Sequence, residues 1–128
     1  MLTTGPMGAH HMIGVDLERA DAAVVQQDTM DRLVARLGIA PTHIKVDVEG
    51  FEDDVLLGGQ EILQQRRPVL FLELHNQMLR DRGRKPADLL RWLQGLGYTL
   101  AWRGEVVSVQ DAIVADLTRL VCTTELDN

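Results

Sequence analysis

Four side chains of the types that carry out acid–base chemistry follow two apolar runs of the chain. Asp47 and Glu49 close a run of alternating β-branched residues, and Glu73 and His75 close a second apolar run. Alternate residues of a strand share a face, so each pair lies on one side of its strand. Carboxylates and an imidazole in one place favour proton transfer, orientation of a hydroxyl or amine, or cation binding. Lys45 shares the face of Asp47 and could instead neutralise it in an ion pair.

The elements around these residues predict how they come together. The runs at 43–48 and 69–74 have the composition of buried strands, and the stretch at 52–65 between them has apolar residues at helical spacing. A strand, a helix and a second strand predict parallel neighbours. Ligands of open α/β sheets bind beyond the carboxyl ends of the strands. We therefore expect the four side chains to meet at this edge.

The remaining pattern completes an α/β fold. A helix beginning after Asp28 or Thr29 should end at Gly38, and a second should run from Pro86 to about Gly97. Strand patterns occur at 98–102, 105–109 and 117–123, with weaker ones at 13–17 and 22–27. We predict a largely parallel sheet, covered by helices on both faces, with an antiparallel edge at its C-terminal end.

Three further acids, Glu52, Asp53 and Asp54, have a simpler explanation. They follow Gly50 at the predicted start of a helix, where the helix dipole favours negative charge by about 0.3–1 kcal/mol per residue. We assign them to that role. Asp47 cannot be explained in this way, because it lies upstream within the apolar strand. Gly50 should take a positive φ or admit a close approach at the strand-to-helix turn.

Composition excludes several classes of function. The 128 residues are 45% hydrophobic and carry a net charge of -6, which predicts one soluble domain without a nucleic-acid-binding surface. We expect a loose segment at 1–14 and a domain at 15–128. No apolar run approaches the roughly 20 residues of a membrane span, and the N-terminus lacks the pattern of a signal peptide. The single cysteine, Cys122, is predicted to be a buried thiol of a cytoplasmic protein.

A longer motif contains the first pair of site residues. The string Ile44-Lys-Val-Asp-Val-Glu-Gly-Phe-Glu, then Val55-Leu-x-Gly-Gly and Pro68-Val-Leu-Phe-Leu-Glu-Leu, resembles the FkbM family of S-adenosylmethionine-dependent methyltransferases. Thr29-Met-Asp is similar to a Thr-Leu-Asp that members tend to have upstream. The match holds in order, spacing and residue type across about 28–75.

The resemblance implies both a fold and a reaction. It implies a class I methyltransferase (Rossmann-like) sheet, with 43–48 as its fourth strand and 69–74 as its fifth. The implied reaction transfers a methyl group from S-adenosylmethionine to a hydroxyl of a sugar or small natural product. Asp47 and Glu49 would then be catalytic, with Asp47 orienting or deprotonating the acceptor. Glu73 and His75 would bind the acceptor molecule.

The cofactor side of that fold has no counterpart in the motif. Class I methyltransferases hold the cofactor with a Gly-rich loop after the first strand and an acid ending the second, and neither is found before Thr29. The chain therefore resembles the C-terminal half of a family member, with the cofactor-binding strands missing and the cofactor-binding residues unknown. The sheet edge left unpaired predicts self-association.

Two alternatives remain open. One is a non-catalytic remnant that acts as an interaction module. The other is a metal-dependent enzyme that uses the four strand-end side chains as ligands; the methyltransferase interpretation requires no metal.

Overall fold

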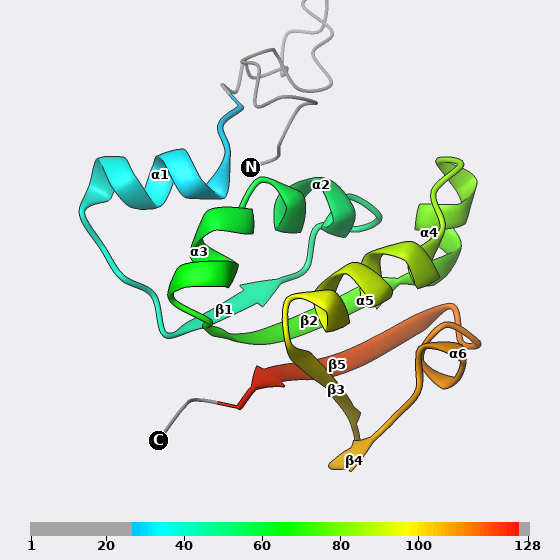
Figure 1. Ribbon diagram of the computed structural model, residues 1–128. Coiled ribbons are helices and arrows are strands. Elements are labelled where there is room, and N and C mark those ends of the chain that lie inside the picture. Colours follow the sequence, from blue (N-terminus) through cyan, green and yellow to red (C-terminus); the bar gives the residue numbers. More distant parts are fainter. Residues whose placement is uncertain (1–26, 126–128) are drawn as a thin grey trace, which may run out of the picture.

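The computed structural model describes residues 27–125, which contain six helices and five strands (Figure 1). In chain order they are α1 (Met30–Leu37), β1 (His43–Val46), α2 (Glu52–Leu57), α3 (Gln60–Gln65), β2 (Val69–His75), α4 (Asn76–Asp81), α5 (Pro86–Gly95), β3 (Tyr98–Trp102), β4 (Glu105–Val106), α6 (Val109–Ala112) and β5 (Leu117–Thr124). The predicted segment 1–14 and the strand pattern at 13–17 lie outside the described residues, as does nearly all of 22–27.

The five strands form one mixed sheet in the order β1-β2-β5-β3-β4 (Figure 1). The expected α/β architecture is confirmed, and β1 and β2 are parallel neighbours as predicted. A largely parallel sheet is wrong, because β5 lies between β2 and β3 and runs antiparallel to both. The β3–β4 pair is also antiparallel, since a two-residue hairpin at Arg103–Gly104 reverses the chain.

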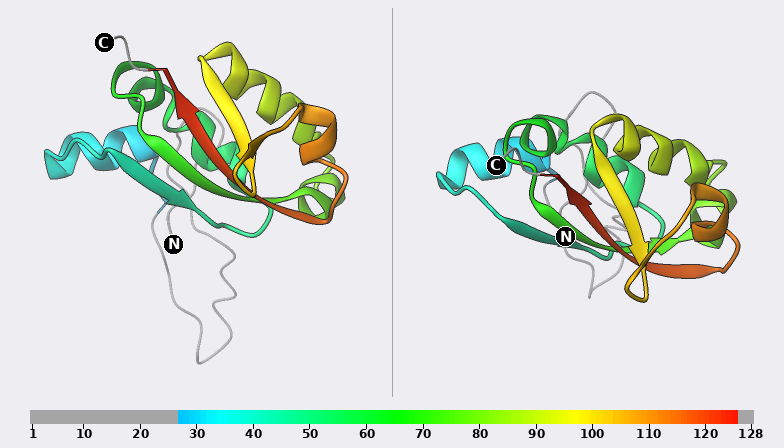
Figure 2. Two further views of the ribbon diagram at one scale, coloured as in Figure 1. Left: turned by 90° about the horizontal axis from the view of Figure 1, so that it is seen from below. Right: turned by 60° about the horizontal axis from the view of Figure 1, so that its bottom comes forward.

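The helices cover one face of the sheet. In Figure 1, α1, α2, α3 and α5 lie above the strands, and the left view of Figure 2 shows the molecule from below. Leu70, Leu72 and Leu74 of β2 point toward the helices and are buried. Phe71 and Val121 point the other way and keep 44% and 39% of their surface exposed. Strands covered on both faces were expected, so this prediction is wrong for the described part of the chain.

Leucine side chains dominate the core between sheet and helices. Fully or almost fully buried members include Val46, Leu56, Leu63, Leu72, Leu90, Leu93, Leu100 and Leu120. Removing one such side chain to alanine typically costs about 2–5 kcal/mol. The predicted burial of Cys122 is confirmed, and burial raises the pKa of its thiol to about 12. At neutral pH this thiol is therefore protonated and unreactive.

The single helix expected at 52–65 is two helices, separated at Gly58 and Gly59. Asp31 of α1 provides the physical reason. Its backbone N–H donates to the Gly58 carbonyl at 3.0 Å, and its carboxylate accepts the backbone N–H groups of Glu61 and Ile62 at 3.0 and 3.1 Å. The first turn of α3 thus receives its N-terminal cap from a distant helix.

Other boundaries also differ from the predictions. β1 ends at Val46 instead of at 48, and β4 has two residues where a strand at 105–109 was expected. The pattern did not predict α4 or α6. The caps of α1 agree with the sequence: the Thr29 side chain accepts the Arg32 N–H, and Gly38 ends the helix at φ 65.

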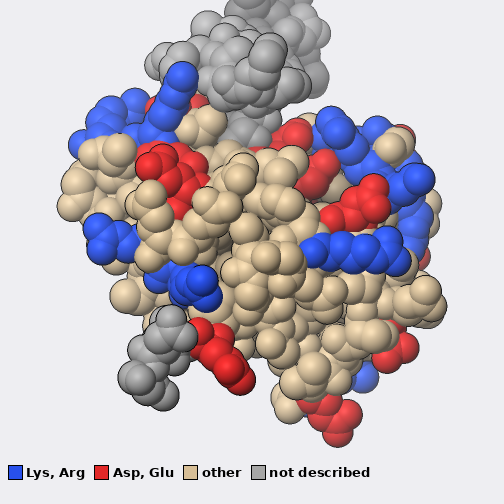
Figure 3. All heavy atoms as spheres, in the orientation of Figure 1, with Lys and Arg blue, Asp and Glu red and all other residues tan. Residues whose placement is uncertain are grey.

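Charges of both signs are interspersed on the face shown in Figure 3. Blue and red atoms alternate at its right side, and apolar or uncharged surface fills the centre. Within residues 27–125, no helix is long and apolar enough to cross a membrane.

Candidate functional site

The strand register brings Asp47 and Glu73 side by side. The last registered pair of β1 and β2 joins Val46 to Leu72; Asp47 directly follows β1, and Glu73 is the next residue of β2. His75 lies two residues further along the face of Glu73. One carboxylate or imidazole atom from each of Asp47, Glu73 and His75 lies within 4.8 Å of the other two. We call these three residues the strand-end cluster.

Glu49, the fourth predicted site residue, is not part of this cluster. Because β1 ends at Val46, the alternation that would have stacked Glu49 on Asp47 stops, and Glu49 lies in the following turn at φ 49. It lines a shallow hollow of about 250 Å³ together with Asp47, Val48 and Phe51. Glu49 thus lies beside Asp47 but is not one of the three residues of the cluster.

Glu52 has a place in the site that the sequence did not predict. It begins α2, as expected, yet its side chain is completely buried. Its Oε2 accepts the Gly50 N–H at 2.7 Å, and its Oε1 accepts the His75 N–H at 2.7 Å. Assigning Glu52 to the helix dipole alone is therefore wrong, because this carboxylate ties the end of β2 to the turn after β1.

His75 is held at one edge of its ring and open at the other. Nδ1 lies 3.1 Å from Oε1 of Glu52 and 3.1 Å from the backbone oxygen of Glu73. Nε2 faces the strand-end cluster, with Oδ1 of Asp47 at 3.7 Å. The side chain keeps 14% of its surface exposed. The ring is therefore fixed from inside while Nε2 remains reachable from the cluster.

The two carboxyl groups of the cluster differ in their electrostatics. Glu73 pairs with Arg119, which is its registered neighbour on β5, at 2.9 Å. Hydrogen bonding to Arg119, and then to Asp47, lowers the pKa of Glu73. Hydrogen bonding to Glu73, aided by desolvation and by the Glu73 charge, raises the pKa of Asp47. Asp47 is thus the carboxyl group that takes up a proton first as the pH falls.

Arg82 holds the turn between β1 and α2. Its guanidinium contacts Asp53 Oδ1 and Asp54 Oδ2, both at 3.0 Å, and donates to the Gly50 carbonyl. It also lies over the Phe51 ring, 4.1 Å from its centroid. These contacts explain the acids at 53 and 54 more fully than a helix dipole does. Sequence spacing gave no signal for Arg82, which is nearly thirty residues away.

Gly50 has the special conformation that the sequence predicted. Its φ is 96, and a Cβ built there would lie 2.7 Å from Met78 Cβ. Both a left-handed backbone and a close neighbour therefore require glycine at this turn.

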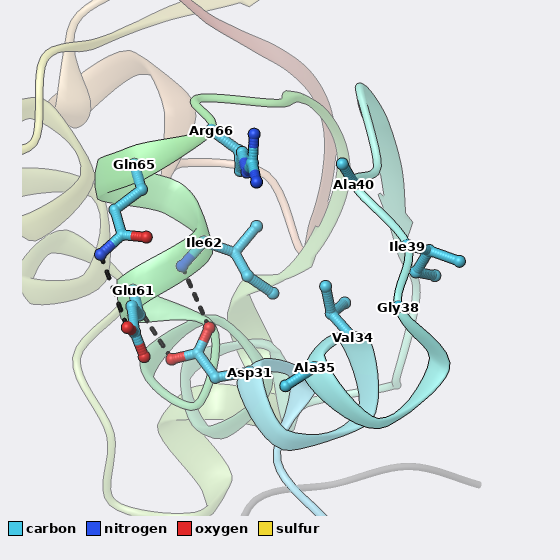
Figure 4. Close-up of a pocket in the computed structure, with 10 residues that line it drawn as sticks. All are labelled: Asp31, Val34, Ala35, Gly38, Ile39, Ala40, Glu61, Ile62, Gln65 and Arg66. Carbon is cyan, nitrogen blue, oxygen red and sulfur yellow. Dashed lines mark hydrogen bonds between the residues drawn. The ribbon is translucent and has the colours of Figure 1, made fainter.

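Other hollows lie away from the cluster or along its margin. A groove of about 400 Å³ separates α1 from α3 near the start of β1, and Val34, Ile39 and Ile62 form its apolar part (Figure 4). The carboxylate of Asp31 points to the α3 backbone there and is fully engaged (Figure 4). On the open face of the sheet, a depression of about 350 Å³ borders Phe71 and Arg119.

Comparison with known proteins identifies one family. The family model described as "Methyltransferase FkbM domain" matches residues 6–100. No curated protein and no solved structure matches the chain. The matched range contains β1, β2 and every residue of the strand-end cluster.

Proposed function

Because the chain belongs to the FkbM methyltransferase domain family, we propose that it serves methyl transfer from S-adenosylmethionine to a hydroxyl group. The acceptor would be a sugar or a small natural product. The observation that carries this proposal is the strand-end cluster, with Asp47 and the open edge of His75 at the carboxyl ends of two parallel strands. Methylation of a hydroxyl releases a proton, and these are groups that can accept one.

Each side chain receives a role from its position. Asp47, with its raised pKa and exposed carboxyl group, orients or deprotonates the acceptor hydroxyl. Glu49 lines the hollow beside Asp47 and would lie near the transferred methyl group. Glu73 and His75 bind the acceptor, and Arg119 keeps Glu73 ionised so that it accepts hydrogen bonds.

S-adenosylmethionine, when bound, supplies an electrophilic methyl group on a positively charged sulfur. The exposed carboxylates at 47 and 49 suit a cationic ligand in sign. The hollow that they line is about 250 Å³, below the roughly 300–1,000 Å³ of ordinary ligand pockets. The described residues therefore do not enclose this cofactor, and we assign no step to it here.

We further propose that β1 and β2 are the fourth and fifth strands of a class I methyltransferase-like sheet, and that residues 15–128 are the C-terminal part of such a domain. The outer edge of β1 has no partner strand among residues 27–125, which favours self-association through that edge. A cytoplasmic location agrees with the free, buried Cys122. We propose no nucleic-acid or membrane partner.

Calorimetric titration of the full chain with S-adenosylmethionine tests cofactor binding. We expect saturable binding, weakened by D47N because one of the exposed carboxylates is lost. Incubation with methyl-labelled cofactor and a panel of sugars then tests the reaction. Label in an alkali-stable ether supports transfer to a hydroxyl. No binding heat at millimolar cofactor, or label only in alkali-labile esters, would contradict the proposal.

A divalent-cation site is the second candidate, because the three ligand atoms of the strand-end cluster lie within 4.8 Å of one another. An imidazole and two carboxylates suit Mn²⁺ as a ligand set. Arg119 would compete with a cation for the Glu73 carboxylate, and this competition favours the metal-free interpretation. Calorimetry with Mn²⁺ decides between them: binding that D47N abolishes supports the cation site, and no binding removes it.

A further inference from the structure

The surroundings of Nδ1 determine which form of the His75 ring is compatible with the structure. Its two neighbours at 3.1 Å are a carboxylate oxygen of Glu52 and the backbone oxygen of Glu73. The backbone oxygen can only accept, and the Glu52 oxygen already accepts the His75 backbone N–H at 2.7 Å, so a protonated Nδ1 satisfies both. A neutral ring then has its lone pair on Nε2, the nitrogen that faces Asp47 at 3.7 Å.

Glu52 can hold this arrangement because it is immobile. The side chain has no exposed surface, and a buried carboxylate requires hydrogen-bond donors on its oxygens. The Gly50 N–H occupies one oxygen, and the backbone and ring N–H groups of His75 share the other. These partners belong to the turn after β1 and to the end of β2, which are the two elements that form the site.

We propose that Glu52 is a positioning residue that binds the Nδ1–H of His75, and that Nε2 of His75 accepts the proton of the acceptor hydroxyl. This inference rests on the proposed methyl transfer and makes it more specific. The O–H bond of the acceptor breaks as an Nε2–H bond forms. The electron pair of the broken bond stays on the acceptor oxygen, so that this oxygen becomes the nucleophile. The proton then leaves Nε2 for water, through the exposed part of the ring.

This assignment gives His75 and Asp47 different roles within the cluster. The positively charged ring formed during the step lies between the Glu52 carboxylate on one side and Asp47 on the other. A carboxylate bound to Nδ1 stabilises that ring and fixes its direction. Asp47 then orients the acceptor hydroxyl, instead of removing its proton.

Nuclear magnetic resonance of the wild-type chain tests the ring directly and needs no cofactor. Long-range ¹H–¹⁵N spectra show which nitrogen of a neutral histidine carries the proton. We expect the proton on Nδ1 of His75, with a resonance shifted downfield by its bond to a carboxylate. A proton on Nε2 would overturn the proposal, whatever the outcome of the cofactor titration.

Two variants distinguish the Glu52–His75 hydrogen bond from the general effect of negative charge at the start of α2. In E52Q the Nδ1 proton should move upfield, because a neutral amide oxygen replaces the carboxylate. In D54N, which removes a charge two residues away without touching His75, the resonance should stay unchanged. An equal shift in both variants would overturn the role of Glu52. If E52Q does not fold, the wild-type tautomer and its downfield resonance still decide the question.

Turnover distinguishes failure of this inference from failure of the proposed function. H75N keeps a side-chain N–H for Glu52 but lacks Nε2. With methyl-labelled cofactor and an acceptor that the wild type methylates, H75N should lose about 10²-fold or more in rate while binding the cofactor normally. Unchanged turnover in H75N would reject His75 as the proton acceptor and leave methyl transfer intact. No transfer by the wild type would count against the proposed function, while the tautomer measurement would stand.

Discussion

Two groups of acids on either side of His75 behave in opposite ways. Glu52, Asp53 and Asp54 at the start of α2 are largely buried and fully engaged by backbone N–H groups or by Arg82. Asp47 lies beside Glu73 at the strand ends and keeps 38% of its side-chain surface exposed, while Glu73 is paired with the exposed Arg119. Both groups consist of aspartate and glutamate, so residue type alone does not distinguish them. The acids at the start of α2 hold the backbone in place through their contacts. The acids at the strand ends remain accessible to a ligand.

The difference shows how burial divides structural from chemical roles. A buried carboxylate requires its donors, so removing either side leaves an uncompensated group in the interior. An exposed carboxyl group needs no fixed partner, and its free lone pairs remain available for a substrate. We therefore expect mutations in the first group to act on stability and mutations in the second to act on chemistry.

The largest effect should follow E52A. Three N–H groups lose their acceptor at once, so the free energy of unfolding should fall by about 3–5 kcal/mol, the usual cost of breaking a buried charged interaction. Urea unfolding followed by circular dichroism measures the loss. D54N is the matched control at the same helix start, where the side chain is less buried. A loss in E52A no larger than in D54N would remove the distinction between the two acids.

The next effect concerns the turn that links the two groups. G50A places a Cβ 2.7 Å from Met78 Cβ at a φ of 96, so we expect a loss of about 1–3 kcal/mol in unfolding free energy. G83A is the control, because Gly83 also has a positive φ but no atom near a new Cβ. It isolates backbone strain from the contact. If G50A and G83A lower the free energy of unfolding equally, the contact with Met78 does not contribute to the loss.

A smaller effect should follow R119Q on the exposed side of the comparison. Arg119 lowers the pKa of Glu73, so its removal should raise the midpoint at which the Glu73 carboxyl titrates. Carbon-13 spectra of the side-chain carboxyl groups follow that titration. The urea midpoint should change little, because the ion pair is solvent-accessible. A large loss of stability would place this pair with the buried group instead.

The smallest change in stability should follow D47N, and its sign should depend on pH. The folded state raises the pKa of Asp47, so ionising this group at neutral pH opposes folding. D47N should therefore be as stable as the wild type or slightly more stable at pH 7. This advantage should vanish as the pH falls below the ordinary aspartate value of 3.8. Urea midpoints at both pH values test it, and clear destabilisation at pH 7 would contradict it.

The sequence predicts the meeting of Asp47, Glu73 and His75 because local pattern determines it. Alternation places each side chain on a face, and a strand–helix–strand unit makes the two strands parallel, so equivalent positions come together. The pattern also locates Gly50 and the caps of α1. These predictions depend only on a residue's near neighbours in the chain.

The rest depends on contacts between distant segments, which one sequence does not reveal. Glu52 differs from Asp54 only because His75 lies over it, 23 residues later. The helix at 52–65 divides in two because Asp31 caps its second half. Phe71 resembles an interior strand residue in type, yet it is exposed because α1, α2, α3 and α5 lie on the other face of the sheet (Figure 1). Apolar composition alone cannot tell which face is covered.

The cap that Asp31 gives to α3 makes α1 and α3 one cooperative unit. The amide hydrogens of Glu61 and Ile62 donate to a side chain from another helix, so we expect their exchange with water to quicken when α1 moves away. Hydrogen exchange at the Glu61 and Ile62 amides therefore reports whether α1, which ends at Leu37, is docked on α3. Through this link, motion of the segment preceding β1 reaches the helix that connects β1 to β2.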